Sequence, residues 1–222
     1  MKHRATAMSS PHSGPGSLFV VAAPSGAGKT SLVRALLADA PVMQLSVSFT
    51  TRAPRPGEVD GRDYVFVDQA EFGRRRDAGE FLEWAEVHGN LYATSRTWIE
   101  DRIAAGVDIV LEIDWQGAVQ VQRLFADAVG VFIVPPSIGV LRERLTQRGQ
   151  DSAEVIERRV AAAEAELKQA HRFQYVIINQ DFASALGDLR TIVAAARLRF
   201  PKQHARHPAT FAALGITKRK QV

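Results

Sequence analysis

The segment from residue 23 to residue 30 has the clearest chemical pattern in the chain. It consists of Ala23, Pro24, Ser25, Gly26, Ala27, Gly28, Lys29 and Thr30. Glycines in such a loop let successive backbone N–H groups surround phosphate oxygens, and a helix that begins there adds its positive N-terminal end. The Lys29 ammonium suits the terminal phosphates of a nucleoside triphosphate, and the Thr30 hydroxyl suits Mg²⁺. The segment therefore predicts a P-loop.

The sequence on either side of this loop supports the prediction. Residues 18–22 read as a buried strand, and residues 30–40 read as a helix that ends at Pro41. Strand, loop and helix in this order are the context that a P-loop requires. Ala23 replaces the first glycine of the usual motif, and the alternative is an ordinary glycine-rich turn. We favour the P-loop because all three elements agree.

A second group of polar residues follows, and it suits a separate phosphate group. Arg52 and Arg55 lie three residues apart in a proline-rich segment, and Tyr64 follows two turns marked by glycine. Two guanidinium groups and a phenol together can bind a phosphate. Further along come Glu83, Tyr92, Thr94, Glu112 and Asp114. Taken singly, each of these residues could be a loop charge, a core-edge aromatic, an exposed strand position or a helix cap, so only their joint occurrence indicates a site.

Short apolar runs alternate with helical patterns along most of the chain. Strands are expected at 18–22, 107–113, 131–134 and 175–178, and helices at 30–40, 116–125, 138–147, 154–169 and 183–198. This alternation predicts an α/β fold with a parallel sheet flanked by helices. Between residues 51 and 95 the pattern changes to polar turns, an N-cap box at Asp68 and a hairpin around His88. We expect this part to be an inserted β-rich subdomain.

Composition excludes several classes of protein. The 222 residues are 46% apolar and include no cysteine, which rules out a disulfide framework and a thiolate nucleophile. No apolar run approaches the roughly 18 residues of a membrane span. The chain carries a net charge of +4, but residues 1–17 and 201–222 hold seven bases and no acid, so residues 18–200 carry −3. The basic character therefore belongs to the two ends, and we expect no nucleic-acid partner.

These observations give a domain plan. We expect a disordered leader at 1–17, one domain at 18–200 and a solvated basic tail at 201–222. Four of the six histidines lie in the two ends, so we expect neither a catalytic triad nor a histidine-rich metal site from the remaining two. The leader is a poor secretory signal, so we expect a cytoplasmic protein. Trp84, Trp98 and Trp115 are expected to be packing residues.

Several motifs occur in one order and with compatible spacing. After the P-loop come Thr50-Thr-Arg-Ala-Pro-Arg55, Gly57-Glu-Val-Asp-Gly61, Tyr64, Tyr92-Ala-Thr94, Glu112-Ile-Asp-Trp-Gln-Gly117 and Arg148-Gly149. Over about residues 18–200 this series resembles the guanylate kinase family, and its bacterial members most closely. The resemblance implies a core at 18–50 and 96–200, a GMP-binding insert at about 51–95 and a helical lid at about 138–165.

The resemblance also implies an activity: transfer of the γ-phosphoryl group of ATP to GMP, and to dGMP, in purine nucleotide metabolism, with Mg²⁺ as cofactor. It assigns residues 23–30 and Asn179 to ATP, with Thr30 at the metal. For GMP it assigns Arg52, Arg55, Tyr64 and Tyr92 to the phosphate, Ser48, Glu83, Thr94 and Asp114 to guanine, and Glu112 to the region near the acceptor and metal. The implied catalytic residues are Lys29, Arg52, Arg144, Arg148 and Arg159. Phe49, Ala93 and Gln180 depart from the residues usual in the family.

Two other functions stay open at this point. One is a non-catalytic protein-binding module of guanylate-kinase-like sequence, which would typically lack the P-loop chemistry that Lys29 and Thr30 provide. The other is a related P-loop kinase acting on a sugar phosphate, which would not need the base-recognition residues. A nucleic-acid role for the basic tail is a weaker third, and the sequence leaves the oligomeric state unknown.

The predicted guanine site leads to a test of base selectivity. Guanine presents two adjacent donors, N1–H and the 2-amino group, and a carboxylate such as Glu83 can accept both, whereas adenine lacks this pair. A site that must hydrogen-bond a group rejects an analogue without it by about 10⁴–10⁵. We therefore expect strong preference for GMP over AMP in a coupled assay, and selective loss of GMP turnover in Glu83→Gln. Unchanged GMP turnover in that variant would show that the role is wrong.

Overall fold

The computed structural model of the chain describes residues 14–40, 42–87, 89–147, 149 and 152–217. Within these ranges no helix combines the length and the apolar character needed to cross a membrane. Pro41, His88 and Arg148, which the sequence analysis singled out, lie outside the described residues, as do residues 1–13 and 218–222.

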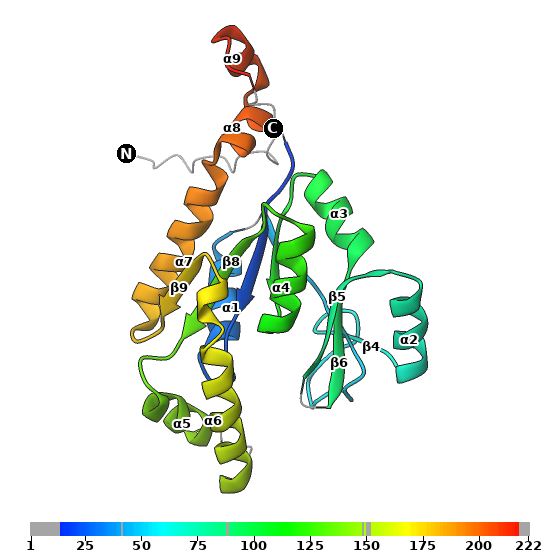
Figure 1. Ribbon diagram of the computed structural model, residues 1–222, viewed down its shortest axis with the longest axis vertical. Helices are drawn as coiled ribbons and strands as arrows, with labels where there is room; N and C mark the ends of the chain where they lie inside the picture. Colours follow the sequence, from blue (N-terminus) through cyan, green and yellow to red (C-terminus); the bar gives the residue numbers. More distant parts are fainter. Residues whose placement is uncertain (1–13, 41, 88, 148, 150–151, 218–222) are drawn as a thin grey trace, which may run out of the picture.

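A five-stranded parallel sheet forms the centre of the molecule (Figure 1). Its strands, in spatial order, are β2 (Met43–Leu45), β7 (Asp108–Glu112), β1 (Leu18–Ala22), β8 (Val129–Val134) and β9 (Tyr175–Ile178). All neighbouring pairs are parallel. The predicted α/β fold with a parallel sheet is confirmed. The sequence analysis missed β2, because three residues are too short to show a period.

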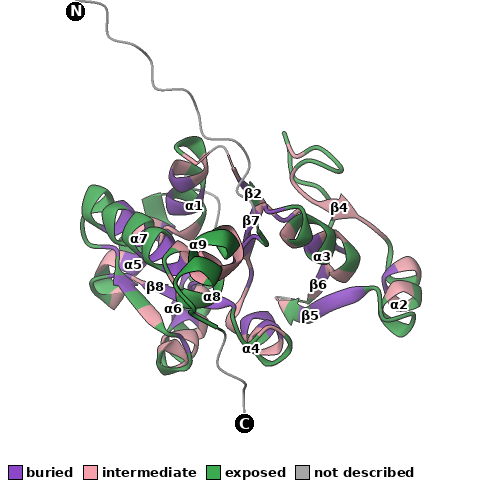
Figure 2. Ribbon diagram, turned by 90° about the horizontal axis from the view of Figure 1, so that it is seen from above, coloured by how far each residue is buried: buried purple, intermediate pink, exposed green. Residues whose placement is uncertain are grey.

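Helices cover both faces of this sheet, because alternate residues of each strand point to opposite sides. From β1, Phe19 and Val21 enter the core beneath α1 (Lys29–Ala38) and α7 (Phe182–Arg197), and Leu18 and Val20 enter the core with α3 and α4. The latter two helices span Arg96–Ala104 and Trp115–Leu124. Every residue of β1 is buried, as expected for a strand covered on both faces. The neighbouring strand β7 is likewise buried over most of its length (Figure 2).

The insert is a separate four-stranded sheet with one helix. Its strands, in spatial order, are β4 (Val65–Phe66), β3 (Phe49–Thr50), β6 (Asn90–Ser95) and β5 (Phe81–Val87). Helix α2 (Gln69–Asp77) packs on the sheet through buried Phe72, and the Asp68 side chain caps it by accepting from the Glu71 N–H. Phe49 and Ala93 take part in this small core, which accounts for apolar residues at both positions.

Two helices form a unit on the other side of the central sheet. Helix α5 (Ile138–Gln147) and helix α6 (Ala153–Leu167) share a small core that includes Leu141, Leu145 and Val160. Figure 1 shows this pair and the β-rich insert flanking the same end of the central sheet. The two helices fall within or next to the range predicted for a lid. Their movement as a lid stays a prediction.

Only residues 14–17 of the predicted leader and residues 201–217 of the predicted tail are described; the first segment ends in buried residues, whereas the second is largely helical and includes no buried residue. Ser17 is buried, and its N–H donates to Asp108 at 2.7 Å, while Arg197 Nε donates to the other oxygen of that carboxylate at 2.7 Å. After α7, helices α8 (Phe200–Arg206) and α9 (Pro208–Ala213) continue the fold. Proline in the first turn of each helix and the tilted and edge-to-face ring contacts among Phe200, His204 and Phe211 explain why this segment is helical.

A short 3₁₀ helix, η1 (Ala170–Arg172), joins α6 to β9. Helices α8 and α9 lie at the end of the molecule opposite α5 and α6 (Figure 1). Helices α8 and α9 are thus far from the two helices α5 and α6 (Figure 1).

Candidate active site

Residues 23–28 form the loop between β1 and α1 at the carboxyl end of the central sheet, and Lys29 and Thr30 are the first two residues of α1. Gly26 and Gly28 have φ values of 88° and 93°, which side-chain-bearing residues rarely adopt. Gly28 is the N-cap of α1, and no side chain hydrogen-bonds to this cap. The loop therefore has the shape, and the helix N-terminus the open N–H groups, that anion binding requires.

Asn179 supports this loop from behind. Its Nδ2 donates to the Ala27 carbonyl at 2.7 Å, and a Cβ on Gly28 would lie only 2.3 Å from the same nitrogen. Asn179 is buried and directly follows β9. Its amide thus holds the P-loop in this structure, and the contact with the ATP base stays a prediction.

The end of strand β7 lies beside the loop. Lys29 Nζ donates to the Ile113 carbonyl at 3.0 Å, and the Thr30 hydroxyl donates to the Glu112 carboxylate. Asp114 caps α4 by accepting from the Gly117 N–H at 2.9 Å. Neighbouring parallel strands end at the same edge of a sheet, where ligands of α/β proteins bind. Two carboxylates and a hydroxyl are therefore gathered next to the P-loop.

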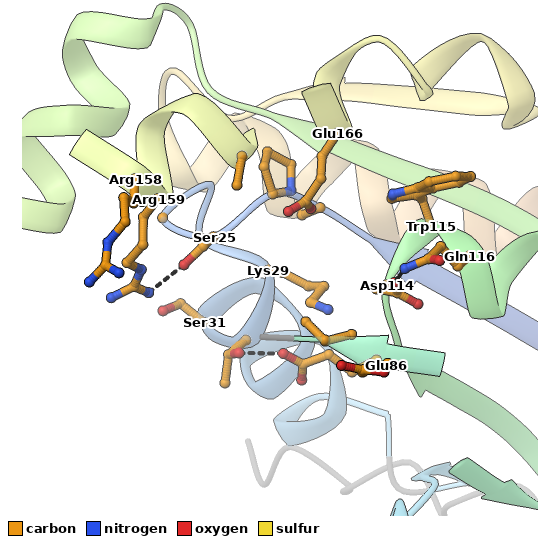
Figure 3. Close-up of a pocket in the computed structure, with 18 of the residues that line it drawn as sticks. Ser25, Lys29, Ser31, Glu86, Asp114, Trp115, Gln116, Arg158, Arg159 and Glu166 are labelled. Atoms are coloured by element: carbon orange, nitrogen blue, oxygen red, sulfur yellow. Dashed lines mark hydrogen bonds between the residues drawn. The ribbon is translucent and has the colours of Figure 1, made fainter. Parts of the chain in front are cut away.

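These residues face a cavity of about 880 Å³ that extends between the P-loop, α6 and the insert (Figure 3). Of the predicted residues, those that line it are Ala23, Pro24, Ser25, Gly26, Gly28, Lys29, Thr30, Arg55, Glu112, Asp114 and Arg159. Residues predicted for ATP, which we call the donor half of the site, and residues predicted for GMP, the acceptor half, thus line one cavity. A volume of this size suits the reacting ends of two nucleotides.

Glu83, which is predicted to bind guanine, does not line this cavity and is 3% exposed. Its carboxylate accepts from the Thr94 hydroxyl at 2.7 Å, across the antiparallel pair of β5 and β6. Desolvation raises the pKa of Glu83 to about 7, and the negative charge of Asp114 adds to the rise, whereas the Thr94 hydrogen bond opposes it. The structure therefore brings together three of the four residues predicted for guanine. The fourth, Ser48, precedes β3, and its carbonyl accepts from the Val65 N–H.

Three of the four predicted phosphate-binding residues, Arg52, Tyr64 and Tyr92, form a second cluster. The Arg52 guanidinium lies 5.2 Å from the centre of the Tyr64 ring, and the Tyr64 and Tyr92 rings are 6.1 Å apart in an edge-to-face arrangement. Burial raises the pKa of the Tyr64 phenol, so it stays a proton donor at neutral pH. Arg55 is exposed and lines the cavity directly.

The predicted lid arginines have different surroundings. Arg159 of α6 donates to the Ser25 hydroxyl of the P-loop, and a dashed line in Figure 3 marks this contact. Arg144 of α5 donates through Nη2 to the Asn179 carbonyl at 2.9 Å, while its buried Nη1 has no hydrogen-bond partner among the described residues. Arg144 does not line the cavity described above, so a phosphate contact by this residue stays a prediction.

Several cavity residues were not predicted as site residues. Glu166 on α6 points into the cavity near Lys29, and Trp115, Gln116, Glu86 and Arg158 also line it. Desolvation raises the pKa of Glu166 to about 7, with Lys29 opposing and Asp114 supporting the rise. The sequence held one signal that could have found Glu166. Residues three and four apart on a helix share a face, so Glu166 lies on the same face of α6 as Ala162 and Arg159. Trp115 both packs against the core and lines the cavity, whereas Trp84 is 40% exposed.

A parallel sheet with a P-loop at its carboxyl edge, facing a second polar subsite across one cavity, is the architecture of a P-loop phosphotransferase. A family model described as guanylate kinase matches residues 16–196. The chain is 61% identical over 202 residues to a guanylate kinase of Ralstonia nicotianae, which covers 91% of each sequence. It is 60% identical over 196 residues to that of Dechloromonas aromatica, covering 88% of this chain and 97% of the relative.

A solved structure gives the same result. The crystal structure of guanylate kinase from Anaplasma phagocytophilum is similar with a TM-score of 0.75 and 32% identity, over 93% of this chain and all of that one. The chain belongs to the guanylate kinase family.

The buried position of Glu83 depends on a glycine in the neighbouring helix, which gives a prediction. A Cβ on Gly117 of α4 would lie 2.4 Å from Glu83 Oε2, so Gly117→Ala must displace the carboxylate. We expect the KM for GMP to rise about tenfold or more, with the KM for ATP unchanged. The matched control is Gly187→Ala on α7, where a Cβ would meet nothing within 4 Å. Wild-type GMP kinetics in Gly117→Ala would contradict this geometry.

Proposed function

We propose that this protein transfers the γ-phosphoryl group of ATP to GMP, giving ADP and GDP, with Mg²⁺ as the cofactor. The observation that carries the proposal is the single cavity shared by the P-loop and by the insert that contains the buried Glu83 carboxylate. We propose dGMP as a further acceptor, because the guanine and phosphate groups that these residues would recognise are the same in both nucleotides. We further propose that the protein works in the cytoplasm, where both nucleotides are available for purine nucleotide metabolism.

In the donor half, the P-loop amides and Lys29 bind the ATP phosphates. Lys29 Nζ needs only to leave the Ile113 carbonyl to reach them. Arg159, already in contact with Ser25 of the loop, lies where it can add positive charge to the transferred group. Arg144 and Arg148 are proposed to join them when the two lid helices approach the cavity.

In the acceptor half, guanine binds between Glu83, Thr94, Ser48 and Asp114, and the GMP phosphate binds to Arg52, Arg55, Tyr64 and Tyr92. The carboxylate of Glu83 accepts from N1–H and from the 2-amino group. Burial makes this recognition selective, because a base without those donors would leave the carboxylate desolvated and unpaired.

The reaction itself demands positioning and charge rather than a general base. A GMP phosphate oxygen attacks the γ-phosphorus while the bond from that phosphorus to the leaving ADP oxygen breaks. The attacking oxygen is already anionic, so no proton has to be removed from it. The protein's contribution is to hold the two phosphates in line and to surround the transferred group with cations and N–H donors.

The residues beside the P-loop fit a bound Mg²⁺. Oxygen ligands suit this ion, and the Thr30 hydroxyl and the Glu112 carboxylate are in contact with each other beside the loop. When bound with ATP, Mg²⁺ supplies charge neutralisation at the phosphates. No group of three or more acidic or histidine residues arranged for a metal occurs among the described residues, in keeping with an ion held largely by phosphates and water.

The two other functions are less well supported. A non-catalytic binding module does not need Lys29 and Thr30, which are present and placed at the cavity. A sugar phosphate kinase does not need a buried Glu83 paired with Thr94. The assay that separates the three uses ATP, Mg²⁺ and either GMP, AMP or a sugar phosphate.

The central experiment on this proposal is Lys29→Ala. Because Lys29 is at the surface of the cavity, the variant should fold normally while GDP formation falls by several orders of magnitude. Lys168→Ala removes an exposed lysine from the end of α6 and serves as the matched control. Wild-type rates in Lys29→Ala would refute the role of the P-loop, and no GDP from the wild-type protein would refute the proposed activity.

A further inference from the structure

A tight turn brings Glu58 back toward the two arginines of the proposed phosphate subsite. In the sequence Arg55-Pro56-Gly57-Glu58 the Glu58 N–H donates to the Arg55 carbonyl at 3.0 Å, and Gly57 has a φ of 86°. Proline at the second position and glycine with positive φ at the third define a type II turn. The local sequence therefore fixes the direction in which the Glu58 side chain leaves the loop.

The Glu58 carboxylate contacts both arginines. Arg52 Nη2 donates to both of its oxygens at 2.9 Å, and the Arg55 backbone N–H donates to Oε2 at 2.7 Å. The side chains of Arg52 and Glu58 are 13% and 19% exposed, so this pair is largely shielded from water. Partial desolvation acts to raise the pKa of Glu58, but the hydrogen bonds from the Arg55 N–H and the Arg52 guanidinium outweigh it and lower this pKa below its usual value. The carboxylate thus stays charged at neutral pH.

The contacts of Arg52 are those of a side chain held in one orientation. Nη1 donates to the Ala53 carbonyl at 2.6 Å, and the guanidinium lies against the Tyr64 ring. Desolvation acts to lower the pKa of Arg52, but hydrogen bonding to Glu58 and Tyr92 outweighs it and raises this pKa. An arginine has some conformational freedom to lose on binding an anion, and a guanidinium that is already fixed loses less of it.

We propose that Glu58 is a positioning residue for the acceptor phosphate, acting through the Arg52 guanidinium and the Arg55 backbone. The inference rests on the proposed function, since it takes the GMP phosphate as the ligand of these arginines. Glu58 touches only Nη2 of Arg52, and a guanidinium offers five N–H donors, so donors remain for a phosphate. It touches only the backbone of Arg55, whose side chain is exposed at the cavity.

The opposite role would be competition, in which the carboxylate fills the place of the phosphate and must leave when GMP binds. The two roles predict opposite signs. Loss of a positioning carboxylate weakens GMP binding, whereas loss of a competing one strengthens it. We commit to positioning because Glu58 uses one nitrogen of Arg52 and no side-chain atom of Arg55.

The test compares Glu58→Gln and Glu58→Ala with the wild-type protein in steady-state assays with ATP and GMP. We expect the KM for GMP to rise about tenfold or more in Glu58→Ala and less in Glu58→Gln, which keeps an acceptor for the Arg55 N–H. The kcat and the KM for ATP should change much less. Glu80→Gln is the matched control, because Glu80 pairs with Arg75 in the same subdomain with both side chains more exposed.

A double-mutant cycle with Arg52→Ala separates positioning from a general structural role. In the Arg52→Ala background, Glu58→Ala should raise the KM for GMP by a smaller factor than in the wild-type protein, because only the contact with the Arg55 backbone is then left to lose. Additive losses, an unchanged KM for GMP, or a lowered one would each overturn the inference. Binding of an ATP analogue by each variant verifies that it is folded. Absence of GMP turnover in the wild-type protein would instead refute the proposed function.

Discussion

A carboxylate buried without a cation dominates the acceptor half of this protein. The Thr94 hydroxyl donates to the Glu83 carboxylate, while desolvation raises the pKa of Glu83 and the negative charge of Asp114 adds to the rise. Burying an ionised carboxylate is costly unless donors meet it. The pairing of β5 with β6 and the missing side chain at Gly117 both serve to hold Glu83 in this position. A base that brings two donors would remove this cost, which is the physical reason for the proposed binding of guanine at Glu83.

The donor half differs from the acceptor half because it must bind anionic phosphates and therefore needs positive charge and N–H donors. It does so with backbone N–H groups at the start of α1 and with Lys29, next to the acids at the end of β7. The central sheet makes this possible, because its parallel strands deliver residues distant in the sequence to one edge. The insert and the α5–α6 pair then flank that edge (Figure 1). Two phosphate groups that repel each other can thus be held at one cavity by separate sets of cations.

The sequence predicted the elements with strong local signals. Buried strands such as β1 and β9 stand out as apolar runs between turns, and the P-loop combines glycines, lysine and threonine in adjacent positions. Much of the site was found through the resemblance of its motifs to a family, since a single tyrosine or arginine has no pattern of its own. The helices after residue 200 were missed because their order depends on ring packing and on contacts with the N-terminal segment, such as Lys202 Nζ with the Gly16 carbonyl.

Contacts between distant segments were also beyond the sequence. The approach of Gly117 to Glu83, and of Glu166 to the P-loop, depends on how helices pack over strands. Glu58 was visible as part of a motif, but its pairing with Arg52 became clear only from the turn geometry. Local chemistry was therefore predictable, and three-dimensional neighbours were not.

The ionisation of Glu83 tests the central claim most directly. Carboxyl carbons can be followed by NMR in protein labelled at glutamate, with the Glu83 signal assigned by its loss in Glu83→Gln. Without nucleotide, we expect this signal to titrate with a pKa of about 7. With GMP bound, it should titrate at clearly lower pH, because the guanine donors favour the charged form. An ordinary glutamate pKa in the free protein, or a value that GMP leaves unchanged, would contradict the account.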